Sequence, residues 1–205
     1  MAGARKPQVL GWPPNVVFVL IAAASFLCCV PMAIPQAHLI AFCGDIGISA
    51  AHGAAMLSLL LGVAFFSRQV WGWIADRIGG LRTALIGSAC QTVTMMGFLL
   101  THDEVRLFGV AAAFGFSFSG LVAAYVLSLR ELFPASEASW RIPTLLLISG
   151  GGMAFGGWIG GVLYDYFAYY GPAFATAVVF GMLNLTVLGI LVWQQRHDSA
   201  VAVPA

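Results

Sequence analysis

Charged residues are scarce in this sequence. Only 8% of its 205 residues are Asp, Glu, Lys or Arg, whereas a soluble domain carries about 25%. Hydrophobic residues make up 60%, and no soluble fold of this size can bury so much apolar surface. We therefore expect an all-α integral membrane protein with membrane lipid as its surroundings. The net charge of +1 and the lack of any basic run also exclude nucleic acid as a partner.

Cysteine is sparse too, and its spacing excludes two kinds of site. None of the cysteines forms a C-x-x-C pair, and all lie within apolar stretches, so neither a metal site nor a disulfide framework is expected. They are Cys28, Cys29, Cys43 and Cys90. No cofactor is expected either, because the glycine repeat of residues 150–161 does not follow a strand, as a dinucleotide-binding loop would require.

Long apolar runs are what the sequence has in abundance. A membrane-spanning helix needs about 20 mostly apolar residues, and the first run is too long for a signal peptide. Ser49 is expected to cap the second helix, and Pro143 and Pro172 to lie in the first turns of the fifth and sixth. Cutting at charges, glycines and prolines predicts six helices, at residues 15–42, 50–74, 83–100, 105–129, 143–164 and 172–193.

Basic residues are unevenly distributed between these helices. If the six helices alternate in direction, Arg106 falls on one side of the membrane and all the other basic residues fall on the opposite side. These are Arg5, Lys6, Arg68, Arg77, Arg82, Arg130, Arg141 and Arg196. The positive-inside rule then places both termini in the cytoplasm. The expected location of the protein is a plasma or inner membrane. The predicted organisation is an N-terminal segment (1–14), a six-helix domain (15–195) and a C-terminal tail (196–205).

The connection between the second and third predicted helices reads GWIADRIGGLRT, from Gly72 to Thr83. Its paired glycines permit the backbone to reverse, and Asp76 places a carboxylate at the membrane edge. Such a carboxylate can accept hydrogen bonds from a helix N-terminus in one conformational state and release them in another. From spacing alone, an ordinary polar loop is an equal alternative.

This stretch resembles the signature loop of the major facilitator superfamily, G-x-L-A-D-R-x-G-R-K/R. It departs from the pattern at Gly80 and Leu81, where the family usually has two basic residues. The resemblance implies that the loop joins the second and third helices of a six-helix half, and that Asp76 engages the opposite half. The residues that match the signature are Gly72, Ile74, Ala75, Asp76, Arg77 and Gly79. The predicted gating motif consists of Gly72, Asp76, Arg77, Gly79, Arg82 and Asp165.

A second pattern supports this resemblance. The segment Gly161–Asp165 repeats the G-x-(I/L)-x-D spacing of Gly72–Asp76 on the opposite membrane face, as two inverted three-helix repeats would; chance agreement in a glycine-rich chain is the alternative. The HLxxFxxDxGIS stretch (His38–Ser49), together with Arg68 four residues before Gly72, resembles the C-terminal half of monocarboxylate and oxalate/formate transporters.

Arg68 is the sharpest candidate for substrate contact. It lies eight residues before Asp76, so roughly 12 Å inside the helix end, where a charge facing lipid costs about 2.5–3.5 kcal/mol. Its guanidinium fits a carboxylate in two-point contact. In the transporter branch named above, the matching arginine is taken to bind the substrate carboxylate. The alternative is that Arg68 extends to the headgroups.

Weaker candidates lie on other helices. His38 and Gln36 follow two prolines of the first helix, and His38 is either an anion-binding or proton-relaying residue or a satisfied polar residue at the interface. Ser117, Ser119, Tyr125 and Ser149 are candidate cavity hydroxyls. Gly152, Gly156 and Gly160 recur every four residues, which favours close helix packing.

The resemblance implies a secondary active transporter, or half of one, moving a small organic anion by alternating access. The only lysine is Lys6, so a monocarboxylate is expected rather than a dicarboxylate. The expected partner is a second six-helix half, supplied by another copy or by a separate chain. An inactive truncated half and a non-transporting membrane scaffold are the alternatives. An enzyme is not expected, because no serine–histidine or aspartate pair is placed at membrane depth.

Overall fold

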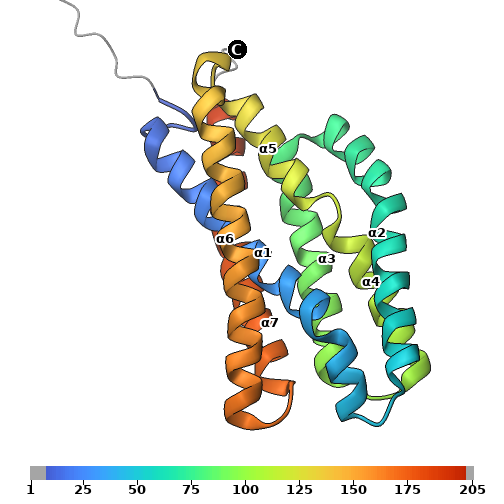
Figure 1. Ribbon diagram of the computed structural model, residues 1–205. Coiled ribbons are helices and arrows are strands. Elements are labelled where there is room, and N and C mark those ends of the chain that lie inside the picture. The colour runs from blue at the N-terminus through green and yellow to red at the C-terminus, as the bar shows by residue number, and fades with distance from the viewer. Residues whose placement is uncertain (1–7, 202–205) are drawn as a thin grey trace, which may run out of the picture.

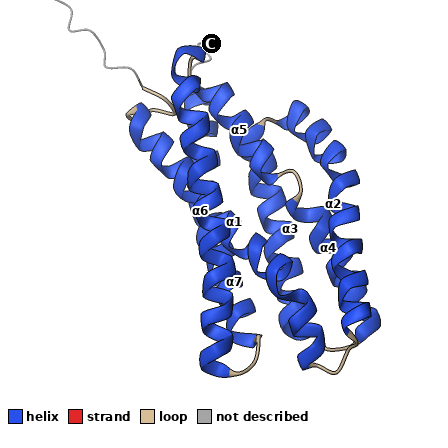
Figure 2. Cartoon of the chain, viewed as in Figure 1, coloured by secondary structure: helices blue, strands red, loops and turns tan. Residues whose placement is uncertain are grey.

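The computed structural model describes residues 8–201, with side chains up to His197. Within this part of the chain the regular structure is helical, apart from an isolated bridge between Val9 and Trp12. Figures 1 and 2 show its helices, which are α1 (Pro14–Asp45), α2 (Ala50–Ile78), α3 (Gly80–Leu100), α4 (Glu104–Phe118), α5 (Leu121–Leu132), α6 (Ala135–Phe167) and α7 (Gly171–Val201). Because α4 and α5 together form one span, the described chain holds six apolar helices long enough to cross a membrane, which confirms the predicted number.

The spans pack in a pattern that repeats between the two halves of the chain. The first span lies along the fifth, α1 on α6, and the fourth lies along the second, α4 on α2. Likewise α1 packs on α7, while α4 and α5 pack on α3; α3 and α7 then meet each other. Exchanging the first three spans for the last three maps these contacts onto themselves. This is the arrangement of two inverted three-helix repeats.

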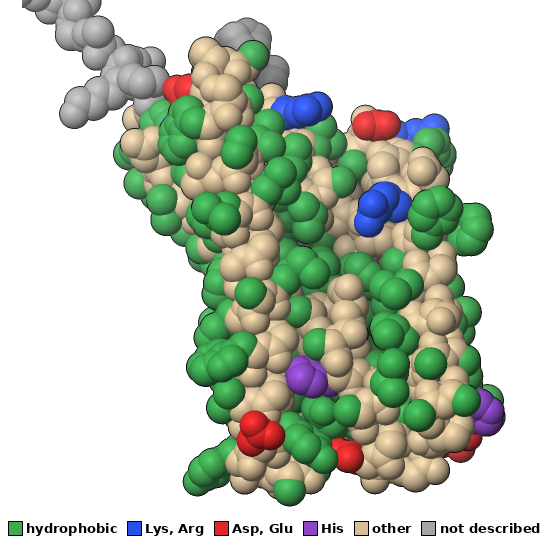
Figure 3. Space-filling view, in the orientation of Figure 1, with side chains coloured by type: hydrophobic (Ala, Val, Ile, Leu, Met, Phe, Trp, Pro, Cys, Tyr) green, Lys and Arg blue, Asp and Glu red, His purple; other side chains and the backbone are tan. Residues whose placement is uncertain are grey.

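Charged side chains gather at the two ends of the bundle (Figure 3). The end where α2 finishes, here called the Arg-rich end, carries Arg77, Arg82, Arg130, Arg141 and Arg196 among the described residues. The other end, here called the acidic end, carries Asp45, Asp103, Glu104 and Asp165, together with Arg106. Arg5 and Lys6 lie outside the described residues. Which end faces the cytoplasm stays a prediction.

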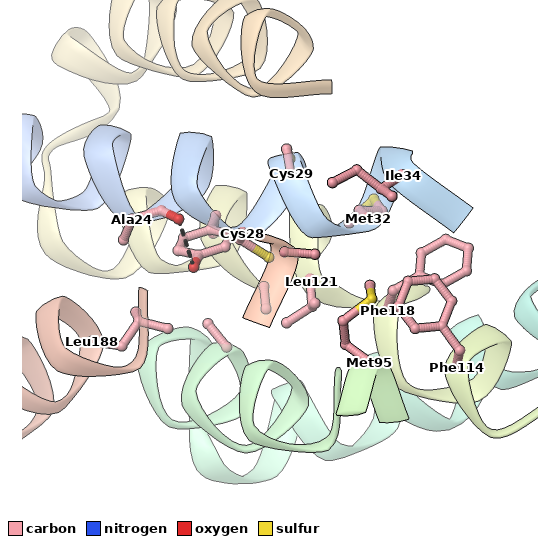
Figure 4. Close-up of a cluster of buried hydrophobic side chains, with 14 of the residues drawn as sticks. Ala24, Cys28, Cys29, Met32, Ile34, Met95, Phe114, Phe118, Leu121 and Leu188 are labelled. Atoms are coloured by element: carbon pink, nitrogen blue, oxygen red, sulfur yellow. Dashed lines mark hydrogen bonds between the residues drawn. The ribbon is translucent and has the colours of Figure 1, made fainter. Parts of the chain in front are cut away.

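Several polar residues of α3 and α7 are buried inside the bundle, among them Ser88, Gln91 and Asn184. Asn184 donates from Nδ2 to Ser88 Oγ at 2.8 Å and accepts from the Tyr125 hydroxyl at 2.8 Å. Gln91 donates to the Cys28 carbonyl at 3.4 Å. Figure 4 shows Cys28 and its apolar neighbours in the surrounding core. With these groups bonded internally, the outer faces of the bundle are apolar, as lipid requires.

The helix ends agree with the sequence prediction in part. Ser49 caps α2 as predicted, accepting from the His52 amide at 3.3 Å, and Pro172 lies in the first turn of α7. The prediction for Pro143 was wrong: α6 begins eight residues earlier, at Ala135, so Pro143 lies inside the helix. Helix α7 continues to Val201, past the predicted boundary at 195.

The early start of α6 has a physical cause in Arg141. This side chain is only 2% exposed. Its Nε donates to Glu137 at 2.8 Å, and its Nη2 donates to Asn15 Oδ1 at 3.0 Å. The ring of Phe133 lies 4.2 Å below the guanidinium carbon. Bonds from the buried Arg141 guanidinium to Glu137 and Asn15 therefore stabilise a charged segment as the first turns of a helix, although its composition suggested a loop.

Candidate functional site

Arg68 lines an open cavity of about 490 Å³ between the helices. Four spans contribute to it: α1, α2, the α4–α5 span and α6. Among the described residues that line it, Arg68 alone is charged, and Gln36 and Ser119 are the polar neighbours. The full lining is Met32, Gln36, Arg68, Phe118, Ser119, Val122, Ala123 and Met153. The structure therefore presents one guanidinium in a cavity that is otherwise neutral and largely apolar.

A second, smaller cavity of about 200 Å³ lies on the side of the Arg-rich end. It shares Arg68 and Ala123 with the larger one, and it also reaches Trp71, Gly72 and Asp76. Asp76 lies two turns beyond Arg68 on α2, and both side chains are exposed in this chain. The predicted substrate residue and the predicted gating carboxylate thus face one continuous side of α2.

Gln36 and Ser119 are each held by a neighbour. Gln36 donates from Nε2 to the Met32 carbonyl at 2.8 Å. Ser119 shares a 2.7 Å hydrogen bond with Ser67, which precedes Arg68 directly. Of the candidates drawn from the sequence, the structure therefore brings together Arg68, Gln36 and Ser119.

His38 lies elsewhere, at the contact of α1 with α6 and α7. Its Nε2 lies 2.9 Å from the Gly157 carbonyl, which can only accept, so this nitrogen carries the proton. The Tyr170 hydroxyl lies 3.5 Å from Nδ1. Burial, and then the nearby Asp45 carboxylate, raise the pKa of Tyr170 above its ordinary value. Its phenol therefore stays a neutral donor, and the arrangement matches a satisfied polar residue at the interface.

Ser117 and Tyr125 also point away from the Arg68 cavity. Ser117 donates to the Phe114 carbonyl at 2.8 Å and lies 3.2 Å from Thr94, on the α3 side of its helix. Tyr125 is fully buried, with its hydroxyl directed at Asn184 and the Ala24 carbonyl. The Ser149 hydroxyl is hydrogen-bonded to the Ser25 hydroxyl of α1. The structure thus places these hydroxyls in contacts between helices.

The glycines of α6 lie against α1. A Cβ added at Gly152 would lie 2.6 Å from the Phe26 carbonyl oxygen, and one at Gly156 would lie 2.3 Å from that of Val30. At Gly160 it would meet the His38 ring at 2.9 Å. At Gly152 and Gly156 no side chain fits without moving the helices apart, because the backbones of α6 and α1 touch there; at Gly160 the neighbour is the His38 side chain.

The motif loop forms a tight reversal at the Arg-rich end. Gly79 has φ +83°, a conformation that glycine adopts without strain. A Cβ on the next residue, Gly80, would lie 2.5 Å from the Ser128 amide nitrogen of α5. This close approach leaves no room at Gly80 for the basic side chain usual in the signature loop, which explains the departure at this position; Leu81, the second departing residue, is buried.

Sequence reasoning missed Glu131, which completes the same loop. Its carboxylate accepts from the Gly80 amide at 3.0 Å, at the N-terminus of α3. An acid directly after Arg130, at the end of a predicted span, was the available signal. The other charges of the motif are exposed; the Arg77 guanidinium stacks 3.4 Å over the Trp73 ring. Asp165 lies at the opposite, acidic end, as the repeated spacing predicted.

Comparison with known proteins places this geometry in context. No family model matches the sequence. The chain is 24% identical over 147 residues to an MFS-type transporter of Penicillium oxalicum and 23% identical over 143 residues to one of Gibberella moniliformis. It is 25% identical over 172 residues to monocarboxylate transporter 13 of Rattus norvegicus. These alignments cover 71%, 66% and 83% of this chain but only 35%, 34% and 40% of the relatives.

A solved structure shows the same fold. The crystal structure of a POT family transporter in complex with 5-aminolevulinic acid matches with a TM-score of 0.73 at 18% sequence identity, over 92% of this chain and 40% of that one. This match confirms the predicted fold, six helices arranged as one half of such a transporter. The three relatives named above are all transporters.

Proposed function

We propose that this chain, a six-helix half of the major facilitator superfamily type, forms one half of a secondary active transporter for a small organic anion. The observation that carries the proposal is the lone guanidinium of Arg68 in a cavity of about 490 Å³. A cation at membrane depth is costly without a partner. A carboxylate that binds there gains a two-point contact, and Gln36 and Ser119 supply further polar contacts.

The rest of the lining favours a monocarboxylate. Met32, Phe118, Val122 and Met153 offer an apolar wall, and no second cation lies among the residues that line the cavity. A substrate with one negative charge and a short apolar body suits this lining better than a dicarboxylate. The similarity to a monocarboxylate transporter supports the same substrate class.

The proposed partner is a second six-helix half, provided by another copy or by a separate chain. The chain spans 34–40% of the length of the relatives that it matches. Arg68 and Asp76 are exposed along one side of α2, so the cavity has an open side that a second half would close. The excess of arginine at one end supports an orientation in which that end and both termini face the cytoplasm. The proposed location is a plasma or inner membrane.

Uptake of radiolabelled pyruvate into proteoliposomes tests the proposal. The wild-type assembly should accumulate pyruvate, and Arg68→Lys should abolish uptake, because a point charge cannot reproduce the planar fork. The matched control is Arg106→Lys, an exposed arginine at the acidic end, which should transport normally. Equal uptake by Arg68→Lys and wild type would remove the assignment of Arg68.

The mass of the purified assembly in a nanodisc decides whether a complete cavity exists. Two copies, or this chain with a second six-helix chain, would support a transporter. A lone chain of 21.6 kDa that takes up no monocarboxylate would instead support an inactive half or a scaffold.

A further inference from the structure

The fourth span is interrupted beside the Arg68 cavity. Helix α4 ends at Phe118 and α5 begins at Leu121, which leaves Ser119 and Gly120 outside both. The sequence predicted one unbroken helix over residues 105–129. Breaks of this kind need a cause, such as a side chain inserted into the hydrogen-bond ladder.

Trp71 of α2 supplies that cause. The side chain is 4% exposed, and its indole N–H donates to the carbonyl of Phe116 at 2.6 Å. In a continuous helix this carbonyl would accept from the amide of Gly120, four residues on. Among the described residues no backbone bond joins the Gly120 amide to this carbonyl, and the indole N–H is the donor found there instead.

Contacts on either side of this bond fit the same arrangement. A Cβ at Gly120 would lie 2.2 Å from the Cβ of Trp71, so only glycine lets the two helices approach this closely. One turn earlier on α2, Ser67 is hydrogen-bonded to Ser119 at 2.7 Å. Two side chains of α2 thus hold both residues of the break, and Arg68 lies between them in sequence.

We propose that Trp71 is a positioning residue for the Arg68 cavity, holding the break open so that Ser119 faces Arg68. The inference rests on the proposed function and adds a residue that lies behind the anion site. In a membrane the Phe116 carbonyl must find a donor. When the fourth span is interrupted, the indole N–H donates to this carbonyl. When the span is a continuous helix, the Gly120 amide donates to it instead. Rewinding would rotate Ser119 relative to Arg68.

Trp71→Phe tests this directly, because it keeps a ring in place and removes only the N–H donor. Without the indole, the Phe116 carbonyl should pair with Gly120. Hydrogen–deuterium exchange of peptides covering residues 116–122, measured on the purified assembly, should therefore slow at least about fivefold. Trp158→Phe, at an exposed tryptophan of α6, is the matched control and should exchange like wild type. Unchanged or faster exchange in Trp71→Phe would overturn the proposal.

Transport kinetics give a second readout. Trp71→Phe should raise the KM for pyruvate about tenfold and change the maximal rate per folded transporter less than twofold. A packing defect alone would lower the amount of active protein and leave KM unchanged, which would count against a positioning role. If the wild type takes up no pyruvate, the proposed function fails, while the exchange experiment still tests Trp71.

Gly120→Ala changes the contact between Gly120 and Trp71 at the Gly120 position. Its methyl group would displace Trp71 and weaken the bond to Phe116, so KM should rise in the same direction. If Trp71→Phe does not fold, Gly120→Ala carries the test, and a wild-type KM in that variant would contradict the proposal.

Discussion

The carboxylate of Glu131, in the last turn of α5, accepts a hydrogen bond from the amide of Gly80, the first residue of α3, at 3.0 Å. The first amides of a helix lack backbone partners, and a carboxylate there also meets the positive end of the helix dipole. The fourth span is thus tied to the loop between the second and third spans. The predicted gating loop is therefore anchored within its own half, while Asp76 remains exposed in the last turn of α2, just before this loop.

Removing this anchor should destabilise the chain modestly. Glu131→Ala should cost about 1 kcal/mol, as loss of a helix N-cap does, and lower the thermal unfolding midpoint in detergent by about 2–4 °C. Glu131→Gln keeps an acceptor oxygen and should lose less. Equal midpoints for Glu131→Ala and wild type would show that the Gly80 bond adds nothing to stability.

Gly80→Ala should be more damaging, because the added Cβ would lie 2.5 Å from backbone and side-chain atoms of Ser128. Overpacking of this kind costs about 1–3 kcal/mol, and here the backbone of α5 would have to move. Gly62→Ala is the matched control: nothing lies within 4 Å of its Cβ position, and alanine is the better helix former. Thermal unfolding should separate the two variants, and a Gly80→Ala midpoint at or above that of Gly62→Ala would contradict the packing account.

Local signals in the sequence account for much of this fold. Six apolar runs predict six spans, Ser49 marks the start of α2, and the paired glycines mark the reversal before α3. The start of α6 and the break at Gly120 could not be predicted in this way. Each depends on a partner far away in sequence: Asn15 for Arg141 and Trp71 for Gly120.

The same distinction applies to the candidate site. Arg68 stands out locally, because a charge inside an apolar run must face protein or water. Hydroxyl groups carry no such signal, since a serine on a predicted helix can face either side. Ser119 lies in the Arg68 cavity, whereas Ser117, two residues earlier, bonds toward α3, and only the packing of the helices distinguishes them.

Arg141 should be sensitive even to a conservative change. Arg141→Lys keeps the charge, but one ammonium group cannot reproduce the separate bonds from Nε to Glu137 and from Nη2 to Asn15. Because Glu137 is partly exposed and water can replace its partner, we expect a loss of about 2 kcal/mol, below the cost of breaking a fully buried pair. Arg130→Lys, at an exposed arginine of the same end, should unfold like wild type in a thermal scan. A similar midpoint for both variants would show that the bonds of Arg141 do not stabilise the start of α6.

The contact between α1 and α6 should tolerate no methyl group. Gly156→Ala would place a Cβ 2.3 Å from the Val30 carbonyl oxygen, and close approach of backbones is what small residues contribute to helix packing in lipid. We expect a loss of about 1–3 kcal/mol, measured as a lower unfolding midpoint and a lower yield of monodisperse protein. Gly150→Ala on the same helix has open space at its Cβ and should not change the unfolding midpoint. Equal unfolding midpoints for Gly156→Ala and Gly150→Ala would exclude a tight contact at Gly156.

Tyr125→Phe separates a structural hydroxyl from a substrate contact. The sequence suggested a cavity residue, but the hydroxyl is buried and donates to Asn184 at 2.8 Å. Hydrogen bonds between membrane helices contribute about 0.6 kcal/mol on average and up to about 1.7 kcal/mol, so Tyr125→Phe should lower the unfolding midpoint slightly. Its KM for pyruvate should equal that of the wild type, because the hydroxyl points away from the Arg68 cavity. A tenfold rise in KM with an unchanged midpoint would mean that Tyr125 reaches the substrate in another state of the transport cycle, and that its bond to Asn184 breaks during transport.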